Sequence, residues 1–255
     1  MDSELMAEIE RKARGLKLSP EQLAKMIDHA LLYPDSPRSS FKNLCFEAKK
    51  YRFYSVCVNP AWVKFCFEEL MGTDVKVVTV ISFPFGQMTP MMKAMEASEA
   101  VENGASEVDM VMNIGAFKSK DYDYVREDVE AVVEAVGGKI VKVIIEAGYL
   151  TDDEVVKACE IVRQAGAHFV KTATGFGPSG ATVRQVYLMR KTVGENFGVK
   201  ASGGIRNLRD TLLMIAAGAN RIGSSSSVRI IEECKAAEFN RSFEDTFNKI
   251  FTIPR

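Results

Sequence analysis

The sequence predicts an α/β protein, a single (β/α)8 TIM barrel with extra N-terminal helices. Eight short apolar, β-branched runs alternate with amphipathic helical stretches along the 255 residues. Their starts are roughly 20 to 35 residues apart, which is the length of one βα unit with its return loop. Apolar strands that alternate with helices form a covered parallel sheet, and eight units close most simply into a barrel. An open doubly wound sheet is the alternative, weakened because no G-x-G-x-x-G motif follows the first run.

The runs expected to form strands are residues 26–29, 55–58, 75–81, 107–112, 140–145, 169–172, 199–202 and 221–224. About residues 1–24 are expected to form an N-terminal helical extension. The barrel is expected over about 25–235, and a C-terminal helix and tail over 236–255. No Pro/Ser/Gly-rich linker or change in composition divides the chain, so residues 1–255 are interpreted as one domain.

Helix signals precede and separate these strands. Residues 4–14 have a helical pattern, and a short second helix is expected after Ser19, which is followed by proline and glutamate. Thr151 stands three residues before Glu154, which is the spacing of a capping box at the start of a helix. Asn207 precedes another apolar helical run, which ends at Gly218, a suitable C-cap.

Composition excludes several classes of protein. The 33 basic and 34 acidic residues are interspersed and give a net charge of −1, whereas a nucleic-acid-binding protein should show a basic stripe. No apolar run is long enough for a membrane span, and the first residues are too charged for a signal peptide. With two histidines the chain is not expected to hold a metal. Five cysteines without C-x-x-C spacing indicate free thiols and a cytoplasmic location.

Two lysines at strand ends are the candidates for chemistry. In this fold the reactive residues lie at the carboxyl ends of the strands, and Lys171 ends the sixth run while Lys200 lies on the seventh. Lysine is rarely buried unless it is paired or functional. If both lysines point inward on neighbouring strands, burial and mutual repulsion should lower the pKa of at least one of them. A lysine of lowered pKa is partly neutral, and a neutral amine forms Schiff bases with carbonyls. The alternative for each lysine is an outward position or a structural ion pair.

Other polar residues are expected near this pair. Asp109 lies in an otherwise apolar run and is either a member of a proton relay or a buried counter-ion. Asp28 is placed at the end of the first strand, and Cys57 at the end of the second. Lys142 lies near the start of its strand, at the end of a barrel that serves stability, and is interpreted as structural.

Glycine-rich segments follow strands six, seven and eight, and each precedes a helix. Such loops expose N–H groups at a helix N-terminus, where an anion is favoured, and the last two are the usual phosphate seat of this barrel. One glycine loop alone is a common turn, but two consecutive loops with serines and an arginine favour a phosphate monoester. The candidate binding residues are Thr174, Gly175, Gly203, Gly204, Arg206, Gly223, Ser225 and Ser226.

Seven motifs make the chain resemble the deoxyribose-phosphate aldolase family, in order from about residue 25 to 230. They are I-D-H-A-L-L (27–32), V-C-V-N-P (56–60), E-V-D-M-V (107–111), V-K-V-I-I-E (141–146), V-K-T-A-T-G-F (170–176), K-A-S-G-G-I-R (200–206) and R-I-G (221–223). The resemblance implies a metal-free class I aldolase without a cofactor. It would cleave 2-deoxy-D-ribose 5-phosphate to D-glyceraldehyde 3-phosphate and acetaldehyde, reversibly.

The resemblance also implies roles for three residues. Lys171 would form the Schiff base, Lys200 would lower its pKa, and Asp109 would join the proton relay. Several positions depart from the family pattern: Ala30 replaces a threonine, Ala173 a serine, and Ser82 and Ser227 each a glycine, and the last residues lack the terminal tyrosine of some members. These departures bear on rate and specificity rather than on the Schiff-base class.

Two other functions remain open from the sequence. The first is a Schiff-base aldolase or transaldolase for another phosphosugar, supported by Ala30. The second is a catalytically silent barrel that senses a sugar phosphate. The retention of both lysines and the aspartate argues against this second function. A homo-oligomer, dimer or tetramer, is expected because barrels of this kind often pair through their outer helices.

Overall fold

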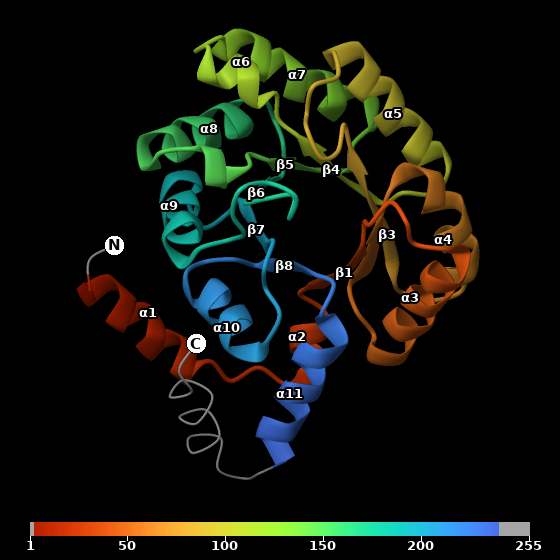
Figure 1. Cartoon of the computed structure of the whole chain (residues 1–255), viewed down its shortest axis with the longest axis vertical. Helices are drawn as coiled ribbons and strands as arrows, with labels where there is room; N and C mark the ends of the chain where they lie inside the picture. Colours follow the sequence, from red (N-terminus) through yellow and green to blue (C-terminus); the bar gives the residue numbers. More distant parts are fainter. Residues whose placement is uncertain (1–2, 240–255) are drawn as a thin grey trace.

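The computed structural model describes residues 3–239, which form a closed barrel of eight parallel strands (Figure 1). Each strand pairs with the next along the chain, and β8 pairs back onto β1. The strands are β1 Ile27–Leu31, β2 Ser55–Val58, β3 Lys76–Ile81, β4 Glu107–Val111, β5 Ile140–Ile144, β6 Phe169–Lys171, β7 Gly198–Ser202 and β8 Arg221–Ser224. The predicted barrel is therefore confirmed, and the doubly wound alternative is wrong.

Helices surround the sheet and connect its strands (Figure 1). They are α1 Ser3–Gly15, α2 Pro20–Ala24, α3 Arg38–Tyr51, η1 Pro60–Trp62, α4 Val63–Leu70, α5 Pro90–Glu102, α6 Ile114–Lys118, α7 Tyr122–Ala135, η2 Ala147–Tyr149, α8 Asp152–Gln164, α9 Val183–Val193, α10 Leu208–Ala216 and α11 Ser227–Phe239. Helices α1 and α2 precede β1, as predicted for the extension. Of the predicted C-terminal helix and tail, residues 240–255 lie outside the described part. No helix within residues 3–239 is long and apolar enough to cross a membrane.

Side-chain caps begin several of these helices, and the one at Thr151 was predicted. Ser19 and Gln22 close a capping box on α2, and Thr151 and Glu154 close one on α8. The side chain of Asn207 accepts a hydrogen bond from the N–H group of Asp210, at 2.8 Å, in the first turn of α10. These local bonds fix where each helix begins, and so they fix the length of the loop before it.

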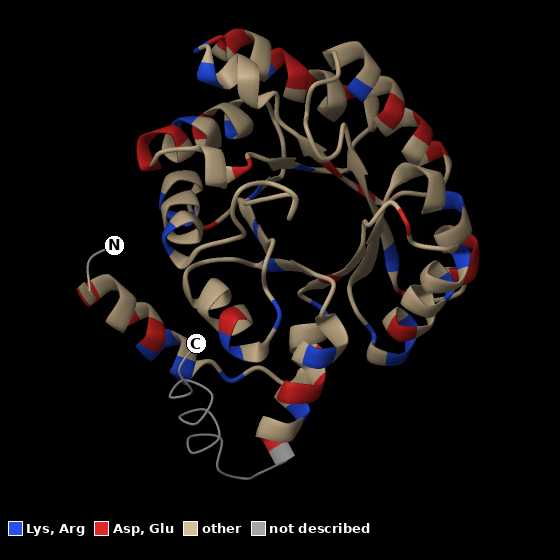
Figure 2. Ribbon diagram, viewed as in Figure 1, with Lys and Arg blue, Asp and Glu red and all other residues tan. Residues whose placement is uncertain are grey.

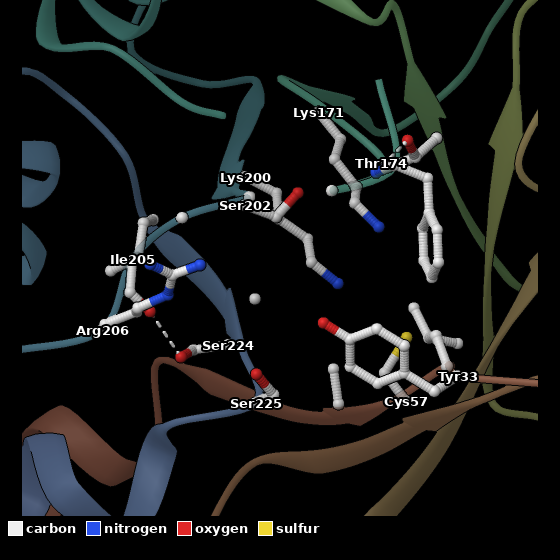
Figure 3. Close-up of a pocket in the computed structure, with 17 residues that line it drawn as sticks. Tyr33, Cys57, Lys171, Thr174, Lys200, Ser202, Ile205, Arg206, Ser224 and Ser225 are labelled. Carbon is white, nitrogen blue, oxygen red and sulfur yellow. Dashed lines mark hydrogen bonds between the residues drawn. The ribbon is translucent and has the colours of Figure 1, made fainter. Parts of the chain in front are cut away.

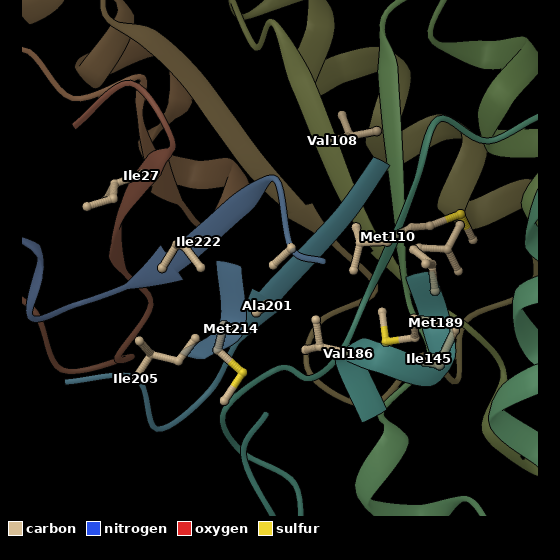
Figure 4. Close-up of a cluster of buried hydrophobic side chains, with 14 of the residues drawn as sticks. Ile27, Val108, Met110, Ile145, Val186, Met189, Ala201, Ile205, Met214 and Ile222 are labelled. Atoms are coloured by element: carbon tan, nitrogen blue, oxygen red, sulfur yellow. The ribbon is translucent and has the colours of Figure 1, made fainter. Parts of the chain in front are cut away.

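The apolar core lies between the outer face of the sheet and the helices (Figure 4). Side chains alternate along each strand, so Val108 and Met110 of β4 face the helices. The residues that alternate with them, Glu107 and Asp109, are buried and face the barrel axis, where they bind charged residues of other strands. Figure 2 shows lysine, arginine and acidic positions on the central strands as well as on the outer helices. The inside of this barrel thus contains a buried set of charged residues beside a small apolar cluster of Cys57, Val78 and Val80.

Candidate active site

A cavity of about 150 Å³ opens at the carboxyl ends of the strands (Figure 3). It is lined by Ala30, Leu32, Tyr33, Cys57, Lys171, Thr174, Gly175, Phe176, Lys200, Ser202, Gly203, Gly204, Ile205, Arg206, Gly223, Ser224 and Ser225. This is the end of a (β/α)8 barrel where reactive residues and loops gather. Most of the residues predicted from the sequence therefore lie around one cavity.

Lys171 is the last residue of β6, and its side chain points into this cavity (Figure 3). The residue is 2% exposed, and its Nζ atom lies 2.8 Å from Oδ2 of Asp109. Burial lowers the pKa of Lys171, and the positive charge of Lys200 lowers it further, while Asp109 opposes the shift. A lowered pKa increases the fraction of neutral amine, which is the nucleophilic form.

Lys200 lies beside Lys171 because the two residues are register partners on the neighbouring strands β6 and β7. Its Nζ atom lies 2.7 Å from Oδ2 of Asp109 and also contacts the carboxylate of Asp28. Burial opposes the charged form, but the two carboxylates outweigh it and raise the pKa of Lys200. The predicted pair of facing lysines, one with a lowered pKa, is therefore present.

Asp109 binds three lysines and not the two that were expected. Its Oδ2 atom accepts from Lys171 and Lys200, and its Oδ1 atom accepts from Nζ of Lys142 at 2.7 Å. Burial raises the pKa of Asp109, but the three ammonium groups outweigh burial and lower this pKa well below its usual value. Lys142 was interpreted as a structural residue at the strand start, yet it belongs to the same cluster. Its register pairing with Asp109 was the missing information.

Two further charged residues complete the cluster, and the sequence did not single them out. Glu107 contacts Nζ of Lys142 at 2.7 Å and Nη1 of Arg221 at 3.1 Å through its Oε2 atom. Arg221 also lies 2.9 Å from Oδ1 of Asp28. Arg221 is the first residue of β8 and Glu107 the first of β4, so both lie at the opposite end of the strands from the carboxyl ends, where reactive residues are expected.

The buried cluster holds four basic and three acidic side chains. The basic members are Lys142, Lys171, Lys200 and Arg221, and the acidic members are Asp28, Glu107 and Asp109. With every group ionised the cluster carries one excess positive charge, and an unbalanced charge is costly inside a protein. Loss of one proton from Lys171, whose pKa is lowered, brings the cluster to neutrality.

The prediction for Asp28 needs correction. Strand β1 extends to Leu31, so Asp28 is the second residue of the strand and not its last. Its carboxylate is buried below the cavity, where it accepts from Ser55, Lys200 and Arg221. Asp28 therefore does not line the cavity, because its position along the strand is too far from the carboxyl end.

Cys57 and Thr174 line the cavity as predicted. Burial raises the pKa of the Cys57 thiol, so this side chain remains a neutral, weakly polar part of the wall. Thr174 is held by Glu146, whose Oε2 atom accepts from both the N–H group and the hydroxyl of Thr174. Glu146 itself does not line this cavity, so its part is to position the β6 loop.

The loops after β7 and β8 form one side of the cavity. Gly203 and Gly204 adopt φ angles of +89° and +76°, which glycine tolerates and which turn their backbone toward the opening. Arg206 is exposed and belongs to the same lining. Ser225 precedes α11, which starts at Ser227, so a helix N-terminus follows directly.

Ser226 and Gly223 of the predicted phosphate seat differ in their positions relative to the cavity. Ser226 does not line the cavity, and its N–H group donates to Oγ of Ser224 at 2.9 Å. Gly223 does line it, but a Cβ atom there would lie 3.0 Å from both Cε of Lys200 and Cβ of Ser202. Glycine at 223 thus makes room for the lysine side chain.

A buried lysine of lowered pKa, a second lysine beside it and a glycine-rich loop at the mouth of a (β/α)8 barrel define a lysine-dependent enzyme of the barrel class. Residues 22–229 match the model of the DeoC/LacD family aldolases. The chain belongs to this family.

Curated relatives and a solved structure agree with that assignment. The chain is 57% identical over 216 residues to the deoxyribose-phosphate aldolase of Caldanaerobacter subterraneus subsp. tengcongensis, which covers 84% of this chain and 94% of the relative. It is 57% identical over 215 residues to that of Clostridium tetani, covering 84% and 100%. The tetrameric deoxyribose phosphate aldolase from Aeropyrum pernix superposes with a TM-score of 0.84 at 34% identity, covering 90% and 98%.

Proposed function

We propose that this enzyme reversibly cleaves 2-deoxy-D-ribose 5-phosphate to D-glyceraldehyde 3-phosphate and acetaldehyde through a Schiff base on Lys171. The observation that carries the proposal is the buried Lys171 amine, with its lowered pKa, at the base of a cavity whose opposite end consists of glycine-rich loops. The names of the relatives at 57% identity support the substrate. The chemistry uses a protein amine and needs neither a metal nor an organic cofactor.

The neutral amine of Lys171 adds to the C1 aldehyde of the open-chain sugar, and loss of water gives a protonated imine. The C2–C3 bond then breaks: its electron pair moves toward the imine to form an enamine, and the C3 hydroxyl loses its proton as C3 becomes the aldehyde of glyceraldehyde 3-phosphate. The enamine takes a proton at C2, and water releases acetaldehyde and the free amine.

Lys200 and Asp109 act on the lysine that reacts. The charge of Lys200 lowers the pKa of Lys171, and Asp109 lies 2.8 Å from Lys171 and 2.7 Å from Lys200. In this position the carboxylate stabilises the protonated imine and can pass a proton between the amines. The loops after β7 and β8 would hold the phosphate through backbone N–H groups, serine hydroxyls and Arg206.

Reductive trapping tests this proposal directly. Borohydride added in the presence of acetaldehyde should leave a two-carbon ethyl group on the peptide that contains Lys171, detected by mass spectrometry. The variant Lys171→Met should give no adduct. An ethyl group on Lys142 or Lys200 in the native chain, or none at all, would show that Lys171 is not the nucleophile.

Steady-state assays distinguish the substrate from its alternatives. We expect cleavage of 2-deoxyribose 5-phosphate to exceed cleavage of ribose and fructose phosphates in kcat/KM. Preference for another phosphosugar would favour the second candidate, an aldolase or transaldolase in which the small Ala30 side chain, part of the cavity wall, admits a different substrate. Binding without turnover of any of these sugars would favour a sensor.

We also propose that the enzyme acts in the cytoplasm as a homo-oligomer, a dimer or a tetramer. The five cysteines support the location, since each is buried and free and therefore suits a reducing compartment. The name of the tetrameric Aeropyrum pernix structure supports the assembly. Light scattering on the purified protein measures the mass of the assembly. We expect the mass of two or four chains, and the mass of a single chain would contradict the proposal.

A further inference from the structure

Tyr33 lies at the mouth of the cavity, in the loop that follows β1. Figure 3 shows its hydroxyl pointing into the cavity, toward the ends of the Lys171 and Lys200 side chains. The ring packs edge-on against Phe176, with centroids 5.7 Å apart, and Phe176 packs in turn against Phe83 at 5.5 Å. These contacts and the following Pro34, which restricts the backbone of Tyr33, hold the hydroxyl in this direction.

The wall of the cavity that Tyr33 covers is otherwise poor in hydrogen-bonding groups. Ala30 and Leu32 come from the same segment as Tyr33 and are apolar, and Cys57 of β2 offers a neutral thiol, which is a weak donor and acceptor. The Tyr33 hydroxyl is the one side-chain oxygen that this wall offers among the described lining residues. The opposite wall holds both lysines and the hydroxyl-bearing residues Thr174, Ser202, Ser224 and Ser225.

The open-chain substrate must cross the cavity between these walls, an inference that rests on the proposed function. Its C1 atom is bound to Lys171, and its phosphate lies on the loops after β7 and β8. The hydroxyl on C3 is two carbons from C1, so it stays close to the lysine ends, where the Tyr33 hydroxyl points. The hydroxyl on C4 lies nearer the phosphate.

We propose that the Tyr33 hydroxyl forms a hydrogen bond with the C3 hydroxyl of the substrate and thereby helps select the sugar that is cleaved. C3 is the carbon that becomes the new aldehyde, so its oxygen must be held while the C2–C3 bond aligns with the imine. A phenol can both donate and accept, so it serves the hydroxyl before cleavage and the carbonyl oxygen after it. In this proposal Tyr33 contacts the substrate directly, although it lies in the loop after β1 and not on the strand itself.

The variant Tyr33→Phe removes only the hydroxyl and keeps the ring that contacts Phe176. We expect kcat/KM for 2-deoxyribose 5-phosphate to fall by about tenfold, the effect of losing one neutral hydrogen bond to a substrate. The rate of reductive trapping with acetaldehyde should remain within twofold, because acetaldehyde has no C3. Exchange of the acetaldehyde methyl protons in D₂O, which requires the enamine, should also remain unchanged.

Tyr149→Phe is the matched control, since Tyr149 is 53% exposed at the same end of the barrel, compared with 59% for Tyr33, but does not line this cavity. Its kcat/KM should equal that of the native chain. A Tyr33→Phe enzyme with unchanged kcat/KM would overturn the inference. So would an equal loss in sugar cleavage, trapping and proton exchange, because that pattern places the defect at the lysines. A native chain that neither traps acetaldehyde nor cleaves the sugar would instead overturn the proposed function.

Discussion

Three lysines bind the carboxylate of Asp109, and their different surroundings explain which of them loses its proton. Lys200 has a second carboxylate from Asp28, and Lys142 has a second one from Glu107. Lys171 has only Asp109 as a carboxylate partner, and it lines the cavity. The pKa of Lys171 therefore falls, while the pKa values of Lys142 and Lys200 rise.

At the residue scale, Lys200→Leu should lower the rate of Schiff-base formation at pH 7 by at least tenfold. Without the repulsion from Lys200, Asp109 holds Lys171 in its protonated form, and each unit of higher pKa reduces the neutral fraction tenfold. The rate of trapping with acetaldehyde, measured from pH 6 to 10, should begin its rise at higher pH. A profile equal to that of the native chain would show that the two lysines do not interact.

Lys142→Met should shift the same profile in the same direction, although Lys142 does not line the cavity. Its removal leaves three basic and three acidic groups in the cluster, so Lys171 can stay protonated without an excess charge. The trapping rate should be reduced at pH 7 and recover near pH 10, where Lys171 is again neutral.

The exposed Lys139, close to the start of β5, provides a control for this variant. Lys139→Met should leave the profile unchanged. A Lys142→Met enzyme that is equally slow at every pH would mean that Lys142 supports the fold of the site and not the protonation of Lys171.

At the scale of elements, the loops after β7 and β8 should contribute specificity for the phosphate. Arg206→Ala removes a positive charge from the cavity lining and leaves the glycine backbone of the loop in place. Losing a charge-assisted hydrogen bond costs about 1.5–3 kcal/mol, so kcat/KM for 2-deoxyribose 5-phosphate should fall roughly 10- to 100-fold. Cleavage of unphosphorylated 2-deoxyribose should hardly change.

A matched variant, Arg163→Ala, removes an exposed arginine from the end of α8, outside the cavity lining. It should leave both substrates unaffected. Equal losses on both substrates with Arg206→Ala would show that the β7–α10 loop shapes the opening and does not bind phosphate.

The order of strands and helices was predictable because β-branched runs and helix caps are local signals. All eight strands overlap the predicted runs, a short helix follows Ser19, and the cap at Thr151 forms as expected. The contacts across the barrel were not predictable in the same way. Whether Lys142 reaches Asp109 depends on the register between β4 and β5, which no local pattern specifies. The position of Asp28 below the cavity was not predicted for a related reason: β1 continues two residues beyond the predicted end.

At the scale of the whole molecule, α1 stabilises the barrel from outside without contributing to the cavity. Ile9 and Ala13 of α1 are buried in the main core, and Glu10 lies 3.6 Å from Arg209 of α10. Ile9→Ala should lower the free energy of unfolding by about 2–5 kcal/mol, because it leaves a cavity in a packed interface. Urea denaturation measures this loss, and kcat/KM of the folded variant should stay unchanged.

Met71→Ala is a suitable comparison for Ile9→Ala, because Met71 is 69% exposed and should change stability by less than about 0.5 kcal/mol. If Ile9→Ala were no more destabilising than Met71→Ala, the extension would not be part of the cooperative unit. A loss of kcat/KM in folded Ile9→Ala would show that the extension influences the site.

The ionic cluster also joins the first strand of the barrel to the last two strands. Asp28 of β1 binds Lys200 of β7 and Arg221 of β8, beside the place where β1 and β8 pair. These contacts connect residues almost two hundred positions apart, and bringing such distant segments together is a slow part of folding. A chain that is folded except for this last docking would lack both counter-ions of Asp28 and would leave two strand edges open to other chains. Recovery of a reactive Lys171 during refolding should therefore coincide with closure of the barrel, and activity and protection from aggregation should be regained together.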